Sequence, residues 1–335
     1  MPRSSPMLDL MLALPEQLLA GYDSGEHCRP RAARGGPRLV AVLGMGGSGI
    51  SGGLLAGLVA DSAPVPVLCC RDYDLSAAVD RRSLAVAISY SGNTEETLSA
   101  FEAALDRGCP VTVVSSGGRL SEEAHRRGLP VAAVPTGLPP RAALGFLFGA
   151  LLALGRQSGV SPVGRREVVA AARLLVARRD VWRRKARNLA RRIGDGLPVV
   201  YATDRLTEPV AERWRCQLNE NAKLLCHSSV LPEHNHNEIV GLGAPAAAAG
   251  SHLFALVAAS THPRTRLRLR QLPAVARGAF RGVTVLEAEG DTRLEQMMSL
   301  VMLGDLLSYE LAVARGVDPV PVARIDELKR RMARG

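Results

Sequence analysis

Two short loops rich in glycine and hydroxyl side chains are the parts of this chain best suited to chemistry. The first runs from Gly44 to Gly53 and the second from Ser89 to Thr97; each follows an apolar, strand-like run and opens a helix-like segment. Such a turn presents free backbone N–H groups, hydroxyls and the positive end of a helix dipole. Two of them on neighbouring parallel strands predict a pocket for a phosphate group.

A sheet whose strands alternate with helices must hold these loops. This alternation is typical of a doubly wound parallel sheet. The strands are predicted at Leu39–Leu43, Val65–Cys69, Leu84–Ile88, Pro110–Val114 and Pro130–Val134, and the helices at Gly49–Val59, Thr94–Asp106, Arg119–Arg127 and Ala142–Leu154.

The second half of the chain repeats the theme after a boundary at Gly159–Gly164. It begins with a long helix over Arg165–Ile193, alternates strands and helices, and ends with helices over Arg293–Ala314 and from about Val322. We therefore expect an α/β fold of two flavodoxin-like lobes with a duplicated architecture. The expected domains are an N-terminal helix and linker (1–36), a first domain (37–158) and a second domain (159–335).

The second lobe lacks a glycine-rich turn to partner its hydroxyl-bearing segment, Ser260–His262. That segment takes the place of the second loop of the first lobe. We therefore expect one phosphate site per chain, in the first lobe.

The net charge, the cysteines and the length of the apolar runs indicate which partners and which compartment to expect. The net charge is +10, and much of it lies between Arg165 and Arg192, which we interpret as the solvated face of a surface helix because no nucleic-acid-binding module accompanies it. Six cysteines show no metal-ligand spacing, which fits a reducing cytosol. No apolar run approaches the roughly 20 residues of a membrane span. We expect a cytoplasmic protein that binds neither nucleic acid nor membrane.

The first loop also fits the dinucleotide fingerprint GxGxxG, through Gly44, Gly46 and Gly49, and Asp72 stands where a ribose-binding acid would be expected. The second loop counts against a dehydrogenase, which has no use for a second anion cradle. No Lys-Ser/Thr pair follows the glycines, so a Walker-type P-loop is excluded.

The second loop resembles the signature of sugar isomerase (SIS) domains through Ser89, Ser91, Gly92, Asn93, Thr94 and Glu96. Over nearly its whole length the chain is similar to the bifunctional phosphoglucose/phosphomannose isomerases of archaea and bacteria. The stretches that carry this resemblance are the two loops, Pro140–Ala143, Asn219–Lys223, Leu231–Ile239 and the tail from Arg315 to Lys329.

The resemblance implies an aldose–ketose isomerase that interconverts fructose 6-phosphate with glucose 6-phosphate, mannose 6-phosphate or both, through a cis-enediol, without metal or redox cofactor. It implies that Glu220 is the base, that Arg141 stabilises the enediolate, and that His236 and Lys329 act in ring opening. In the family this histidine comes from the partner subunit, so a homodimer is expected. The implied phosphate cradle is Gly46, Gly47, Ser48, Ser89, Ser91 and Thr94.

Each of these residues also has a plainer interpretation. Glu220 fits a solvated helix end, Lys329 fits a solvated basic tail, and His236 fits a structural histidine. Because His227 and His234 lie near His236, a metal site was weighed; no separate cluster of Cys or Asp supplies further ligands, so none is expected.

The chain departs from the family pattern in one place. The bifunctional enzymes usually carry a threonine shortly before the C-terminal helix, which gives the sugar room to rotate about C2–C3, whereas Asp318–Val322 has no hydroxyl. Valine fills a similar volume but cannot hydrogen-bond, which puts mannose 6-phosphate activity in question. A non-catalytic SIS-type phosphosugar sensor and an SIS enzyme for amino-sugar or heptose phosphates remain the alternatives.

Overall fold

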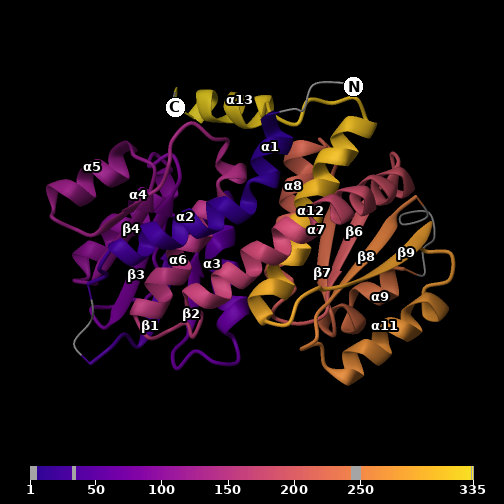
Figure 1. Cartoon of the computed structure of the whole chain (residues 1–335), viewed down its shortest axis with the longest axis horizontal. Helices are drawn as coiled ribbons and strands as arrows, with labels where there is room; N and C mark the ends of the chain where they lie inside the picture. Colours follow the sequence, from indigo (N-terminus) through magenta and orange to yellow (C-terminus); the bar gives the residue numbers. More distant parts are fainter. Residues whose placement is uncertain (1–5, 32–34, 243–249, 333, 335) are drawn as a thin grey trace.

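Two parallel sheets, one in each half of the chain, form the framework of the computed structural model (Figure 1). The structure describes residues 6–31, 35–242, 250–332 and 334. The first sheet has the strand order β2-β1-β3-β4-β5, and every neighbouring pair is parallel. Its strands are β1 (Leu39–Leu43), β2 (Val67–Cys70), β3 (Ser83–Ser89), β4 (Val111–Ser115) and β5 (Val131–Ala133).

Helices cover both faces of this sheet, so its central strands β3 and β4 are buried along their whole length. Every residue of β3 is buried, as expected of a strand covered on both sides. The helices of this half are α1 (Pro6–Leu12), α2 (Leu14–His27), α3 (Gly46–Val59), α4 (Glu95–Asp106), α5 (Gly118–Arg126), η1 (Pro140–Ala142) and α6 (Leu144–Gln157).

The N-terminal helix α2 packs closely on α6. Glycines at the crossing permit this: a Cβ on Gly21 would lie 2.2 Å from the carbonyl oxygen of Phe146, and one on Gly149 would lie 2.3 Å from that of Leu18. The expected N-terminal helix is thus two short helices, and the second is an integral layer of the first lobe.

The second sheet repeats the topology of the first. Its order is β7-β6-β8-β9, which in chain order is 2-1-3-4, the order of the first sheet without its last strand. This confirms the expected duplicated α/β architecture. The strands are β6 (Pro198–Ala202), β7 (His227–Val230), β8 (His252–Val257) and β9 (Gly282–Glu287); the helices are α7 (Arg165–Ile193), α8 (Glu208–Asn221), η2 (Glu233–His236), α9 (Glu238–Gly241), α11 (Pro263–Val275), α12 (Arg293–Ala314) and α13 (Ala323–Met332).

Most predicted elements are present, and the ranges of β1, α7 and α12 are those predicted. The strand β7 was missed because His227–Val230 is a short, half-exposed edge strand without an apolar run. Residues 32–34 of the predicted linker, and residues 1–5, lie outside the described residues. The basic segment is a surface helix as predicted, since α7 buries one apolar stripe and pairs Arg183 and Arg187 with Glu310.

The sequence predicts no apolar run of membrane-spanning length, and α12 contradicts this prediction. This 22-residue helix is long and apolar enough to cross a membrane by length and composition, but 89% of its most apolar 18-residue window is buried within the structure. It lies between the two lobes (Figure 1), where α7 and α8 pack against it. Its apolarity on all sides is explained by burial inside the protein.

One buried ion pair fastens α8 to α12. Arg213 donates two hydrogen bonds to the carboxylate of Asp305, at 2.9 and 2.6 Å, and Gln217 donates a third at 2.9 Å. The side chains of Arg213 and Asp305 are 3% and 5% exposed. Arg213 also donates to the backbone carbonyl of Arg141 at 3.2 Å, so the pair reaches from α12 through α8 to η1.

Asp305→Asn should lower the free energy of unfolding by about 3 kcal/mol, because it leaves the Arg213 guanidinium buried without its counter-charge. Urea denaturation followed by circular dichroism measures this loss. Asp195→Asn is the matched control, since Asp195 is 96% exposed in its pair with Arg315 and its loss should leave the midpoint unchanged. Equal midpoints for the two variants would show that the buried pair does not hold the lobes together.

Candidate active site between the lobes

The first glycine loop lies against the helical turn that carries Arg141. Helix α3 begins at Gly46, whose φ of +51° is in the left-handed region, and its N-cap residue makes no side-chain cap. A Cβ on Gly47 would lie 3.3 Å from the carbonyl oxygen of Pro140 and 3.5 Å from the Cα of Arg141. The uncapped amides at the start of α3 are therefore next to η1.

The second loop lies at the end of the adjacent strand. Strands β1 and β3 are neighbours, and the chain crosses to opposite sides of β1, so the loops that follow them meet at the topological switch point of the sheet. Ser89 is 1% exposed; its Oγ lies 3.0 Å from Oγ1 of Thr94 and accepts from the amide of Gly92 at 3.1 Å. Thr94 is the N-cap of α4 but does not cap it with its side chain.

A close backbone contact fixes the second loop. Gly92 has a φ of +69°, and a Cβ there would lie 1.8 Å from the carbonyl oxygen of Gly117. Only glycine satisfies both constraints. Ser91 is exposed and accepts from the amide of Asn93 at 3.3 Å, so its hydroxyl is at the open side of the loop.

Arg141 is buried, and hydrogen bonds occupy three of its five N–H donors. Its Nε donates to Oδ1 of Asn221 at 2.6 Å, and its Nη2 donates to the carbonyls of Pro319 and Val320 at 2.6 and 2.8 Å. The remaining Nη1 lies 3.6 Å from Oε2 of Glu220. Burial lowers the pKa of Arg141, and the charge of Glu220 opposes this shift. Because the ordinary pKa of arginine is so high, the guanidinium keeps its charge.

The carboxylate of Glu220 therefore faces a fixed cation. It stands at the C-terminal end of α8, and its side chain is 30% exposed, in contrast to the 6% of Arg141. The structure thus brings together two of the residues predicted from the sequence, from opposite halves of the chain.

Lys223 is a neighbour that sequence reasoning did not assign. Its Nζ donates to the backbone carbonyls of Glu220 and Pro321, the latter at 2.7 Å, and its φ of +54° is the only positive one found for a non-glycine residue in the described ranges. Burial and the charge of Arg141 lower the pKa of Lys223, while Asp318 and Glu220 act against this. Its place in the Asn219–Lys223 motif was the only sequence signal for it.

A cavity of about 550 Å³ opens beside Glu220 and Lys223, and the tail and first turn of α13 close its other side. Arg324 of α13 lines this cavity. Lys329, one and a half turns further along α13, is exposed and is not among the residues that line it. Within this chain the structure does not bring Lys329 into contact with Glu220.

His236 lies at the other end of the second sheet from Glu220. Helix α8 ends before the start of β7, whereas His236 follows the end of β7, and β7 itself is about 13 Å long. Figure 1 shows α13, whose first turn borders the Glu220 cavity, at the top and α9, which follows His236, near the bottom. Within one chain, His236 therefore does not join the site.

The neighbouring histidines face a carboxylate instead. Nε2 of His227 lies 3.1 Å from Oε1 of Glu238, and Nε2 of His234 lies 3.8 Å from it. Among the residues that the structure describes, no group of three or more His, Cys, Asp or Glu side chains is arranged to hold a metal ion.

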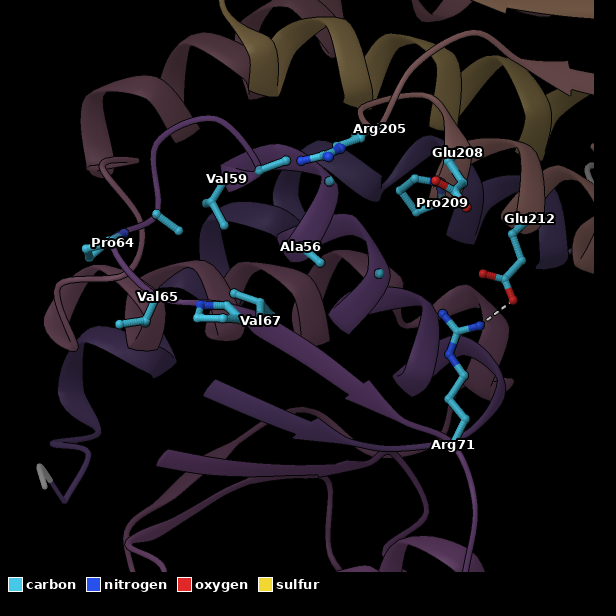
Figure 2. Close-up of a pocket in the computed structure, with 15 residues that line it drawn as sticks. Ala56, Val59, Pro64, Val65, Val67, Arg71, Arg205, Glu208, Pro209 and Glu212 are labelled. Carbon is cyan, nitrogen blue, oxygen red and sulfur yellow. Dashed lines mark hydrogen bonds and ion pairs between the residues drawn. The ribbon is translucent and has the colours of Figure 1, made fainter. Parts of the chain in front are cut away.

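A larger cavity, of about 670 Å³, contains none of the predicted site residues. It is lined by residues of α3, of β2 and the segment before it, and of the start of α8 (Figure 2). Its Arg71 is paired with Glu212, as the dashed line in Figure 2 marks, and donates to the carbonyl of Gly49 at 3.2 Å. This cation is already neutralised, so we do not place the substrate there.

In the second lobe a carboxylate occupies the switch point. Oδ2 of Asp204, after β6, accepts from the hydroxyls of Ser260 and Thr261 at 2.7 and 3.1 Å, and Oδ1 accepts from the amide of Thr207 at 2.9 Å. The Ser260–His262 segment thus follows β8 as Ser89–Ser91 follows β3, but its hydroxyls are used internally. This supports the expectation of a single phosphate site.

The C-terminal part of the chain matches a known family of domains. Residues 183–332 match the bacterial phospho-glucose isomerase C-terminal SIS domain. The match begins within α7, later than the predicted domain boundary at residue 159.

Full-length relatives and a solved structure agree with this match. The chain is 37% identical to a bifunctional phosphoglucose/phosphomannose isomerase of Caldicellulosiruptor bescii, over 98% of this chain and 99% of that protein. It is 36% identical to a protein of the same name from Aquifex aeolicus, over 88% and 90% of the two chains. The C-terminal domain of glucosamine-fructose-6-phosphate aminotransferase from Francisella tularensis shares its fold, with a TM-score of 0.74, 17% identity and coverage of 93% and 97%. The chain belongs to the bifunctional phosphoglucose/phosphomannose isomerase family.

Proposed function

We propose that this protein interconverts fructose 6-phosphate with glucose 6-phosphate, mannose 6-phosphate or both, with Glu220 as the base. One observation carries the assignment: the Glu220 carboxylate and the buried Arg141 guanidinium face each other at 3.6 Å, and the backbone of Arg141 lies against the phosphate-type loop at Gly47. Membership in the family supports the reaction class. The reaction moves a proton between C1 and C2 of the open-chain sugar.

Glu220 and Arg141 have different roles in that step. Glu220 takes the proton from one carbon and returns it to the other, with its carboxylate half-exposed to a cavity large enough for a sugar phosphate. The enediolate oxygen acquires negative charge, and Nη1 of Arg141 is the donor left free to meet it. Because hydrogen bonds to Asn221, Pro319 and Val320 fix the guanidinium, little reorganisation is needed when that charge develops.

The cradle between the two loops holds the phosphate at a distance from the reacting carbons. The uncapped starts of α3 and α4 supply amides and positive helix ends, and the hydroxyl-bearing residues complete it. Binding energy from the phosphate then fixes the carbon chain against Glu220. The cradle residues are Gly46, Gly47, Ser48, Ser89, Ser91 and Thr94.

Ring opening is assigned to His236 from a second copy of the chain, with help from Lys329. The position of His236 at the far end of its own sheet supports sharing, because it leaves the histidine exposed to a partner. A homodimer is thus the smallest complete enzyme. Its small-molecule partners are sugar phosphates, it binds neither nucleic acid nor membrane, and we place it in the cytoplasm.

The segment Asp318–Val322, which lacks the family threonine, is held in place by hydrogen bonds to its backbone carbonyls. Arg141 and Lys223 together bind the carbonyls of Pro319, Val320 and Pro321, so this segment keeps its place beside Glu220 without a hydroxyl. We propose activity on both epimers, with mannose 6-phosphate the poorer substrate because valine cannot hydrogen-bond as the family threonine does. A non-catalytic phosphosugar sensor is the alternative.

Glu220→Gln should lower kcat for fructose 6-phosphate by about 10³-fold with little change in KM, because the amide cannot accept the proton. Coupled assays that read glucose 6-phosphate and mannose 6-phosphate separately measure both products. The matched control is Glu212→Gln, on the same helix about 12 Å away and with a nearly equal side-chain exposure, 29% against 30%. It should keep wild-type turnover.

An inert wild-type protein whose melting temperature still rises with phosphosugars would favour the sensor. Equal losses in Glu220→Gln and Glu212→Gln would contradict the assignment of the base.

Mixing two variants of reduced activity tests the shared site. Glu220→Gln and His236→Asn subunits, unfolded and refolded together in equal amounts, should recover about a quarter of wild-type activity, because half the dimers are mixed and each has one complete site. Each variant refolded alone is the control. Recovery no greater than the mean of the two controls would place His236 in the site of its own chain.

A further inference from the structure

Two anchors on a single tyrosine hold the segment that carries His236. The ring of buried Tyr201, on β6, lies with its centroid 4.3 Å from that of His234, and its hydroxyl donates to Oε1 of Glu238 at 2.7 Å. His234 stands two residues before His236, and Glu238 stands two residues after it. Tyr201 therefore fixes both flanks of His236 through different atoms.

Glu238, which accepts the Tyr201 hydroxyl, makes a further contact with the second sheet. Glu238 also faces His227 of β7, whose Nε2 lies 3.1 Å from Oε1. Although burial acts to raise the pKa of Glu238, hydrogen bonds from His227, Tyr201 and Ser229 hold it at about 2, so the group remains a carboxylate. Burial lowers the pKa of His234, which favours the neutral ring against Tyr201.

His236 itself is free of such contacts. It is exposed, and within the described ranges no hydrogen bond or ion pair involves its side chain. A side chain with no partner of its own depends on its backbone for its position. The contacts at His234 and Glu238 supply that support.

We propose that Tyr201 and Glu238 are positioning residues for ring opening: they hold the backbone around His236 so that its imidazole meets the sugar bound by the partner copy. This inference rests on the proposed function of His236. Neither residue touches the substrate. Their loss lowers the rate at which closed sugars open and leaves the affinity for the phosphosugar unchanged.

The test compares Tyr201→Phe, His236→Asn and the double variant. Tyr201→Phe keeps the ring against His234 and removes only the hydroxyl that binds Glu238. It should lower kcat about tenfold with KM unchanged, and should slow the exchange between anomers of glucose 6-phosphate, read by NMR, to the same degree. In the His236→Asn background the same substitution should cost nothing further.

The control is Thr284→Val, which removes a hydroxyl 2.8 Å from Nε2 of His252 in the same sheet and has no link to His236. It should retain wild-type kcat. The proposal is overturned if Tyr201→Phe keeps wild-type kcat and anomer exchange, or if its loss is undiminished in the His236→Asn background.

A failure of the proposed function gives a different pattern. Wild-type protein that does not turn over fructose 6-phosphate, or His236→Asn with full activity, would remove the role of His236 and the catalytic part of this proposal with it. Hydrogen exchange in the peptide spanning residues 233–238 then tests, independently of catalysis, whether the Tyr201 hydroxyl holds this segment. Faster exchange in Tyr201→Phe than in Thr284→Val supports it, and equal exchange overturns it.

Discussion

The site depends on one buried set of polar contacts between the lobes. The Asp305 carboxylate on α12 holds Arg213 of α8, and Arg213 in turn holds the carbonyl of Arg141. Further along the same two helices, Ser308 accepts from Asn221, which binds the side chain of Arg141. Both the backbone and the guanidinium of Arg141 are thus fixed by the second lobe, although Arg141 belongs to the first. Buried charges tolerate few arrangements, so this network holds the lobes in one relation.

The two lobes share a topology but differ at the switch points of their sheets. Both sheets have the same strand order, and both have a switch point at the carboxyl ends of their central strands. In the first lobe that point is lined by uncapped helix starts and glycines, and in the second it is filled by the Asp204 carboxylate. The second lobe instead contributes the two ends of its sheet, Glu220 at one and His236 at the other. In the function proposed here, the duplicated fold is divided between phosphate binding in the first lobe and proton transfer by residues of the second.

The fold could be predicted from the sequence because its signals are local. Apolar runs such as Leu84–Ile88 and the loops that follow them mark strands and switch points without knowledge of distant contacts. The strand β7 could not be found in this way, since a half-exposed edge strand has no apolar run. The apolar surface of α12 could be interpreted only with its neighbours in view, because length and composition alone also fit a membrane span.

The candidate site was predictable only in part, and the physical reason is the range of its contacts. Residue types and spacing determined the phosphate-type loops, the α/β class and the family resemblance that singles out Glu220, Arg141 and His236. Only the tertiary structure decided that Nη1 is the one nitrogen of the Arg141 guanidinium without a hydrogen bond, that Lys223 and Arg141 hold the tail by its carbonyls, and that His236 stands apart from Glu220 in its own chain. The first two facts follow from hydrogen bonds between residues 80 to 179 positions apart, which no local pattern encodes, and the third follows from where the elements stand along the second sheet.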